Sequence, residues 1–82
     1  MPRQAPLASP YHLFESRRDA GLCCAVAQDR HVPRFIDHET WAFRGTITRA
    51  GQVPPDLNLR AAQASDRLTG YHLFIVLRDA EA

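Results

Sequence analysis

Lysine is absent from this chain of 82 residues, and its ten cationic side chains are all arginines. Nine Asp and Glu residues oppose them, so the formal net charge is only +1. A domain that binds duplex DNA usually carries a clear basic excess, which makes nucleic acid a disfavoured partner. The arginines are scattered from Arg3 to Arg78 rather than clustered, and with twelve alanines they fit the codon usage of a GC-rich bacterial genome.

Long apolar segments are also missing. The longest apolar run covers only residues 22–27, far fewer than the roughly 20 residues that cross a membrane as a helix. The first ten residues contain no apolar stretch of the kind found in a signal peptide. These absences predict a cytoplasmic protein without membrane contact.

Cysteine is scarce, with Cys23 and Cys24 adjacent in the apolar run. Neighbouring residues of a strand point to opposite faces, so the two thiols are poorly placed to bridge each other. The pair cannot form a disulfide framework within one chain, which agrees with a reducing compartment. Inside an apolar strand a cysteine acts as a small hydrophobic residue, and we expect core packing rather than reactivity.

The chain contains an internal repeat. Residues 11–20 and 71–80 both have the sequence Tyr-His-Leu-Phe, three differing residues, and Arg-Asp-Ala. The differing residues are polar at 15–17 and apolar at 75–77. We therefore expect two strands of one sheet, with the second strand central and more buried than the first.

The hydrophobic periodicity predicts a small α+β domain over residues 11–82, after a flexible Pro-containing tail over residues 1–10. The expected elements are strands at 11–16, 22–27, 41–49 and 71–77, an optional short strand at 32–36, and a helix at 57–68. Their order, β-β-(short β)-β-α-β, is that of a mainly antiparallel sheet with one helix packed on one face. Pro33 limits the optional strand to an edge or an irregular cover.

The predicted helix has an apolar face and a polar face. The inward positions are Leu57, Ala61, Ala64 and Leu68, and the outward positions are Arg60, Gln63 and Arg67. Asp56 or Asn58 can cap its start, and Gly70 can end it in a left-handed turn.

The last strand is apolar on both faces, and one helix covers only one of them. Leaving the second face in water would be costly, since burying a Phe or Val contributes about 1.5–3 kcal/mol each. Phe74, Val76 and Phe14 are therefore the expected interaction face. A homodimer is slightly favoured over cover by Val32 to Ile36 or by the tail.

Four residues form a candidate metal or redox site, namely His12, His72, Cys23 and Cys24. The histidines hold equal positions in the repeat and could approach each other if the copies were neighbours. No paired metal-ligand spacing accompanies them, so bonds from each histidine to backbone or water are the preferred interpretation.

No motif indicates catalysis. Residues 37–40 bring acid, base and hydroxyl groups together, but sequence neighbours do not converge on one substrate atom, and a polar turn is expected there. The leading hypothesis is a non-catalytic module without a cofactor, which binds another protein or itself. Nucleic-acid contact through Arg44, Arg60 and Arg67 is an alternative, and the metal or redox site is another.

Overall fold

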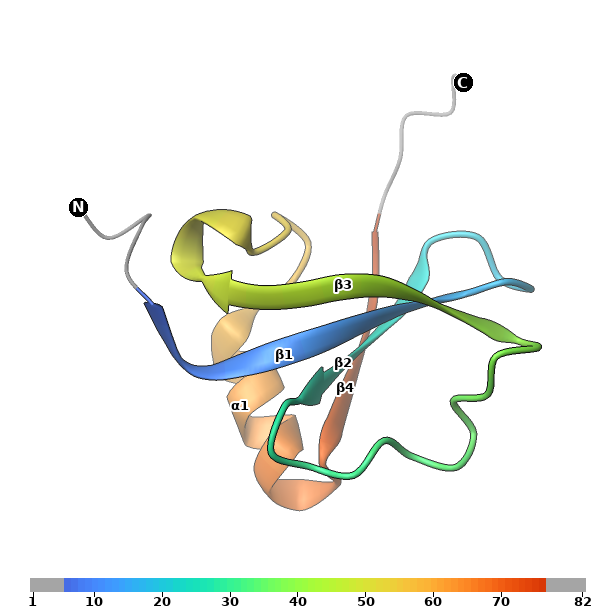
Figure 1. Ribbon diagram of the computed structural model, residues 1–82. Coiled ribbons are helices and arrows are strands. Elements are labelled where there is room, and N and C mark those ends of the chain that lie inside the picture. Colours follow the sequence, from blue (N-terminus) through green and yellow to red (C-terminus); the bar gives the residue numbers. More distant parts are fainter. Residues whose placement is uncertain (1–5, 77–82) are drawn as a thin grey trace.

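The computed structural model describes residues 6–76, which form a four-stranded antiparallel sheet with one α-helix (Figure 1). The elements are β1 (Pro6–Ser16), β2 (Leu22–Ala27), β3 (Trp41–Arg49), a short 3-10 helix η2 (Ala50–Gln52), α1 (Leu59–Leu68) and β4 (Tyr71–Ile75). The strand order β3-β1-β2-β4 makes β1 and β2 central and leaves β3 and β4 as the edges. The predicted α+β class, with one helix on one face of the sheet, is confirmed.

β1 and β2 form an antiparallel hairpin. The hydroxyl of Ser16 accepts hydrogen bonds from the amides of Arg18 and Asp19 and so starts the turn. Gly21 ends it with φ +82°, a left-handed conformation that favours glycine. A Cβ at this position would also lie 2.7 Å from the carbonyl oxygen of Val76, so the approach of the chain after β4 requires glycine as well.

Two boundaries differ from the prediction. β1 begins at Pro6, which pairs with Arg49, so residues 6–10 belong to the sheet and not to a tail. Residues 1–5 lie outside the described residues. Residues 32–36 form no strand but part of an irregular loop, consistent with the missing backbone donor of Pro33.

Both copies of the repeat are strands of one sheet, as predicted, but their burial is the reverse of the prediction. β1 is central and buries Tyr11 to 3% exposure. β4 is an edge strand, in which Leu73 and Ile75 are 46% and 52% exposed. Apolar composition alone does not bury a strand, because burial depends on what packs beside it. Residues 77–80 of the second copy lie outside the described residues.

The predicted cap Asn58 and the predicted end of the helix are confirmed, whereas its predicted start at residue 57 and its predicted buried face are wrong. Asn58 caps the start by accepting a hydrogen bond from the Ala61 amide, and Gly70 follows the helix with φ +88°. The buried helical residue is Ala62; Ala64 is exposed, and Leu68 is 84% exposed. The helix begins at Leu59, so the buried Leu57 lies in the preceding turn and does not set the inward face. The predicted outward residues Arg60, Gln63 and Arg67 are exposed.

The two faces of the sheet are covered differently. On the helix face the core contains Tyr11, Cys23, Ala25, Ala27, Ile47 and Phe74 from the sheet, with Leu57 and Ala62. On the other face Cys24 and Val26 are fully buried. The loop of residues 28–40, called here the cover loop, begins beside α1, and its middle part lies over this second face. Its Phe35 ring lies 5.0 Å from the ring of Tyr71 and 6.0 Å from that of Trp41. The Phe35-containing segment, considered above as a rival to a dimer, thus provides cover within the chain.

Candidate interaction site

The outer edge of β4 has a regular pattern of backbone groups. β4 pairs with β2 in an uninterrupted register from Leu22 opposite Ile75 to Val26 opposite Tyr71. Beyond it, the Val76 amide donates to the Gly21 carbonyl at 2.8 Å. Hydrogen-bonded and non-bonded pairs alternate in an antiparallel ladder, so residues 72, 74 and 76 direct their backbone groups toward β2. The residues whose backbone groups point outward are Tyr71, Leu73 and Ile75.

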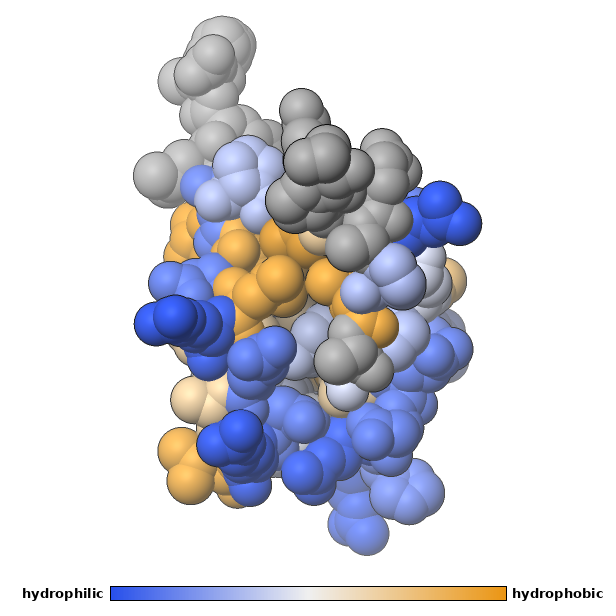
Figure 2. All heavy atoms as spheres, turned by 90° about the vertical axis from the view of Figure 1, so that its left-hand side faces the viewer, coloured by the Kyte–Doolittle hydropathy of each residue, from blue (hydrophilic) through white to orange (hydrophobic). Residues whose placement is uncertain are grey.

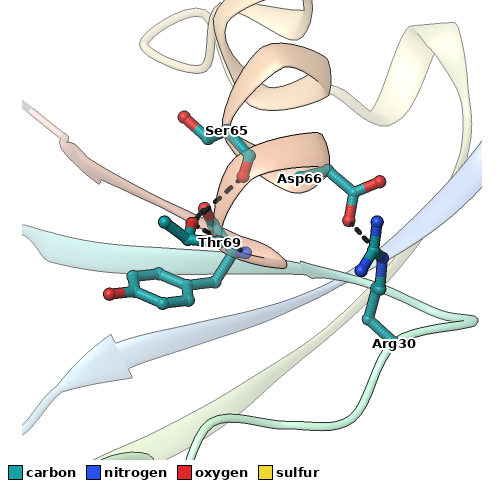
Figure 3. Close-up of polar contacts among 5 residues, drawn as sticks. Arg30, Ser65, Asp66 and Thr69 are labelled. Atoms are coloured by element: carbon teal, nitrogen blue, oxygen red, sulfur yellow. Dashed lines mark hydrogen bonds and ion pairs between the residues drawn. The ribbon is translucent and has the colours of Figure 1, made fainter.

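The outward groups of Tyr71 are already engaged by Thr69, at the end of the helix. The Tyr71 amide lies 3.5 Å from the Thr69 hydroxyl, and that hydroxyl lies 3.0 Å from the Tyr71 carbonyl. The same hydroxyl is 3.0 Å from the carbonyl oxygen of Ser65, so it links the last helical turn to the first residue of β4 (Figure 3). Among residues 6–76, no strand pairs with the outer edge of β4. Leu73 and Ile75 are therefore the residues that offer backbone groups to a partner.

The side chains of Leu73 and Ile75 add apolar surface to this edge. They lie opposite Cys24 and Leu22, and so on the cover-loop face of the sheet. Residues 71–75 contain no charged side chain and no proline. Natural sheets usually protect their edges with charges, prolines, bulges or a covering element. β4 has an uninterrupted register and a neutral sequence, and it therefore presents a template for a further strand.

The opposite edge, β3, is protected. A register shift interrupts its pairing with β1 between Leu13 and Phe14. Near that shift Arg44 forms an ion pair with Glu15, at 2.9 Å between Nε and Oε1. At the end of β3 the side-chain oxygen of Gln52 accepts hydrogen bonds from the amides of Thr48 and Arg49. A bulge, a charge and a side-chain cap thus make β3 a poor template. The described strand β4 has no bulge and no charge, and its side-chain cap, from Thr69, engages only Tyr71.

The apolar surface continues from β4 across the cover-loop face. Six large hydrophobic residues are exposed in the described part of the chain, and five of them lie on this face. These five are Val32, Phe35, Phe43, Leu73 and Ile75. A shallow pocket of about 180 Å³ lies under the cover loop. It is lined by Phe14, Val32, Ile36, Asp37, His38, Trp41 and Phe43.

The helix face also carries a groove, with a volume of about 500 Å³. Its apolar lining includes Leu13, Cys23 and Phe74, and the Glu15–Arg44 ion pair lies at the same groove. Because the Arg44 guanidinium already faces a carboxylate, the described lining of this groove presents no unpaired positive charge to an anionic ligand.

The two repeat histidines do not meet. His12 is opposite Val26 and His72 is opposite Ala25, so alternation places them on different faces of the sheet. Cys24 shares the face of His12, and Cys23 shares the face of His72. Within residues 6–76, no three His, Cys, Asp or Glu side chains are grouped so as to hold a metal ion.

Each histidine instead bonds a hydroxyl of a neighbouring element. His12 Nδ1 lies 2.8 Å from Thr46 Oγ1 and joins β1 to β3. His72 Nδ1 lies 3.0 Å from Ser65 Oγ and joins β4 to α1. Both contacts are partly buried, which makes them structural links between elements.

Cys24 is a poor nucleophile at neutral pH. Burial is the main cause that raises the pKa of its thiol, to about 12, while a hydrogen bond from the His72 backbone opposes the shift. The thiolate is the reactive form of cysteine, so a raised pKa suppresses its reactivity. The expected packing role of both cysteines agrees with their burial.

The charged residues considered for nucleic acid lie on different elements. Arg44 belongs to β3 and is paired with Glu15, whereas Arg60 and Arg67 project from α1.

Figure 2 shows the side at the left of Figure 1, where hydrophilic residues cover most of the lower half and hydrophobic ones gather above. A further ion pair joins Arg30 of the cover loop to Asp66 of α1, at 3.2 Å between Nε and Oδ1 (Figure 3).

The three residues predicted to form one interaction face lie on both faces of the sheet. Phe74 is buried on the helix face and Val76 packs against that core, whereas Phe14 lies on the other face, opposite Cys24. The residues that the sequence analysis missed are Leu73, Ile75 and Thr69. The absence of charged residues from 71–75 could have pointed to them, but the sequence does not show that β4 lies at an edge of the sheet.

Comparisons with models of protein families, with curated proteins and with solved structures find no match. Among the described residues, the only α-helix is the ten-residue α1, which is too short and too polar to cross a membrane.

Proposed function

We propose that this protein is a small, non-catalytic, cytoplasmic interaction module that binds an extended polypeptide segment along the outer edge of β4. The observation that carries the proposal is the pairing of two features at one edge. Leu73 and Ile75 direct backbone groups outward, and their half-exposed side chains lie beside them. In strand addition, backbone hydrogen bonds supply affinity and alternate side chains supply specificity.

The candidate catalytic groups support this choice over an enzyme. The thiol of Cys24 is buried and stays protonated at neutral pH. His12 and His72 each face a hydroxyl that links two elements of the fold. The placement of Cys23 and Cys24 on opposite faces prevents a bond between them, which fits a reducing compartment such as the cytoplasm.

Site-specific photo-crosslinking in cells that produce the protein tests the proposal. A photo-reactive phenylalanine analogue would replace Leu73 in one variant and Ile75 in another. The matched control carries it at Leu68, a more exposed leucine at the end of α1 and outside the sheet. We expect covalent protein adducts from positions 73 and 75 and not from 68. Absence of adducts at both edge positions, or equal adducts at all three, contradicts an edge-directed interaction.

A further inference from the structure

The edge of β4 is complementary to itself. The backbone groups left for a partner belong to Leu73 and Ile75, two residues placed symmetrically about Phe74. We propose that the partner is a second copy of this chain, bound antiparallel through β4 with the two-fold axis at Phe74. The inference rests on the proposed function and specifies its partner.

Among the registers that use only described residues, one satisfies all these groups. With Phe74 on the axis, Leu73 lies opposite Ile75 of the second copy, and Ile75 lies opposite Leu73. Each of these two pairs exchanges two hydrogen bonds, as hydrogen-bonded pairs of an antiparallel ladder do. A register centred on Leu73 would instead pair Ile75 with Tyr71 of the second copy, whose groups Thr69 already engages.

The side chains are compatible with the same register. Opposed residues of an antiparallel pair share a face, so the Leu73 and Ile75 side chains of both copies come together on the cover-loop face. β4 carries no charged residue, and the contact therefore brings no like charges together. The result is one continuous eight-stranded sheet with both helices on one face and both cover loops on the other.

A contact of two short strands is small compared with standard protein interfaces, so we expect a dimer that dissociates at micromolar concentration. Sedimentation velocity over a dilution series should give twice the monomer mass of 9.2 kDa at the highest concentrations and the monomer mass at the lowest. Leu73→Pro removes an outward amide that β2 does not use, and proline is tolerated at such edge positions. This variant should stay monomeric, whereas Leu73→Val, which keeps the amide, should still dimerise.

Disulfide trapping tests the register without relying on the proline variant. Residues opposed in a hydrogen-bonded pair have Cα atoms about 5.5 Å apart, within reach of a disulfide. Because Leu73 lies opposite the native Cys24, both variants are made in a Cys24→Ala background. Leu73→Cys and Ile75→Cys, mixed under mild oxidation, should then cross-link to each other, and either variant alone should not. A monomeric mass at every concentration, or efficient cross-linking of Leu73→Cys with itself, overturns the proposal. If photo-crosslinking finds another protein at the edge and the mass stays monomeric, the interaction function stands and the symmetric dimer fails.

Discussion

His12 and His72 occupy the same position in the two copies of the repeat but lie on opposite faces of the sheet. The cause is a difference of one residue in register, because β2 places Val26 opposite His12 and Ala25 opposite His72. A shift of one residue moves every side chain of a strand to the other face. Near-identical segments therefore meet different surroundings, and each histidine bonds a different neighbour.

The bond between His72 and Ser65 should stabilise the fold by linking α1 to β4. Ser65→Ala is predicted to lower the free energy of unfolding by about 0.5–1.5 kcal/mol, the usual contribution of one hydrogen bond. Gln63→Ala, on the exposed side of the same helix, should change it by less than about 0.5 kcal/mol. Urea unfolding monitored by circular dichroism measures both. Equal stability of the two variants would exclude a stabilising link.

The helix packs on the sheet through Ala62, which is fully buried. Ala62→Leu should overpack this contact and destabilise the protein by about 1–3 kcal/mol. Ala64→Leu places the same side chain on the exposed face and should have little effect. Thermal unfolding of the pair separates the two positions, and a greater loss for Ala64→Leu would show that the helix is rotated from the orientation described.

The cover loop should depend on Phe35, whose ring contacts those of Trp41 and Tyr71. Phe35→Ala is expected to cost about 1–2 kcal/mol, because the side chain is more than half buried but not fully so. Trp41 is the single tryptophan of the chain, and its emission should shift to longer wavelength as water reaches it. Arg34→Ala, a change at an exposed position of the same loop, should leave the emission nearly unchanged. An unshifted spectrum for Phe35→Ala would mean that the loop does not shield Trp41.

Stability should decline at alkaline pH. Burial raises the pKa of the Cys24 thiol to about 12, and burial together with Asp66 and Asp29 raises the pKa of the Tyr11 phenol. The unfolded chain releases these protons at about pH 8.5 for cysteine and about pH 10 for tyrosine. The stabilising contribution is therefore complete below about pH 8.5 and is lost as the pH rises toward about 12. In urea unfolding at a series of pH values, Cys24→Ala should show a shallower alkaline decline, and an unchanged slope would contradict a buried, protonated thiol.

Local patterns in the sequence predicted the elements well. Alternation over Trp41–Arg49 matches β3, and Gly70 lies in the expected left-handed turn. Asn58 caps the helix as one of two candidates. Each of these features depends on residues close together in the chain, where backbone sterics and local hydrogen bonds decide the conformation.

Features that depend on long-range pairing could not be predicted in this way. The apolar character of residues 71–75 indicated a central strand, but among the strands of residues 6–76 β4 pairs only with β2 and lies at the edge. The sheet face on which Phe14 and Phe74 lie depends on how β1 and β4 pair with β2. The two strands have similar sequences but pair with β2 in registers that differ by one residue. The side of α1 that is buried depends on the residue at which the helix starts. Because α1 starts at Leu59, the buried alanine is Ala62 and not Ala64.

Amide hydrogen exchange along β4 tests the central claim most directly. His72 and Phe74 direct their amides to β2, whereas Leu73 and Ile75 direct theirs outward. On dilution from high to low concentration, the amides of Leu73 and Ile75 should lose protection while those of His72 and Phe74 keep it. Strand addition at β4 would be contradicted if the amides of Leu73 and Ile75 exchanged fast under two conditions. These are every concentration of the protein alone, and the presence of each cellular partner recovered by cross-linking.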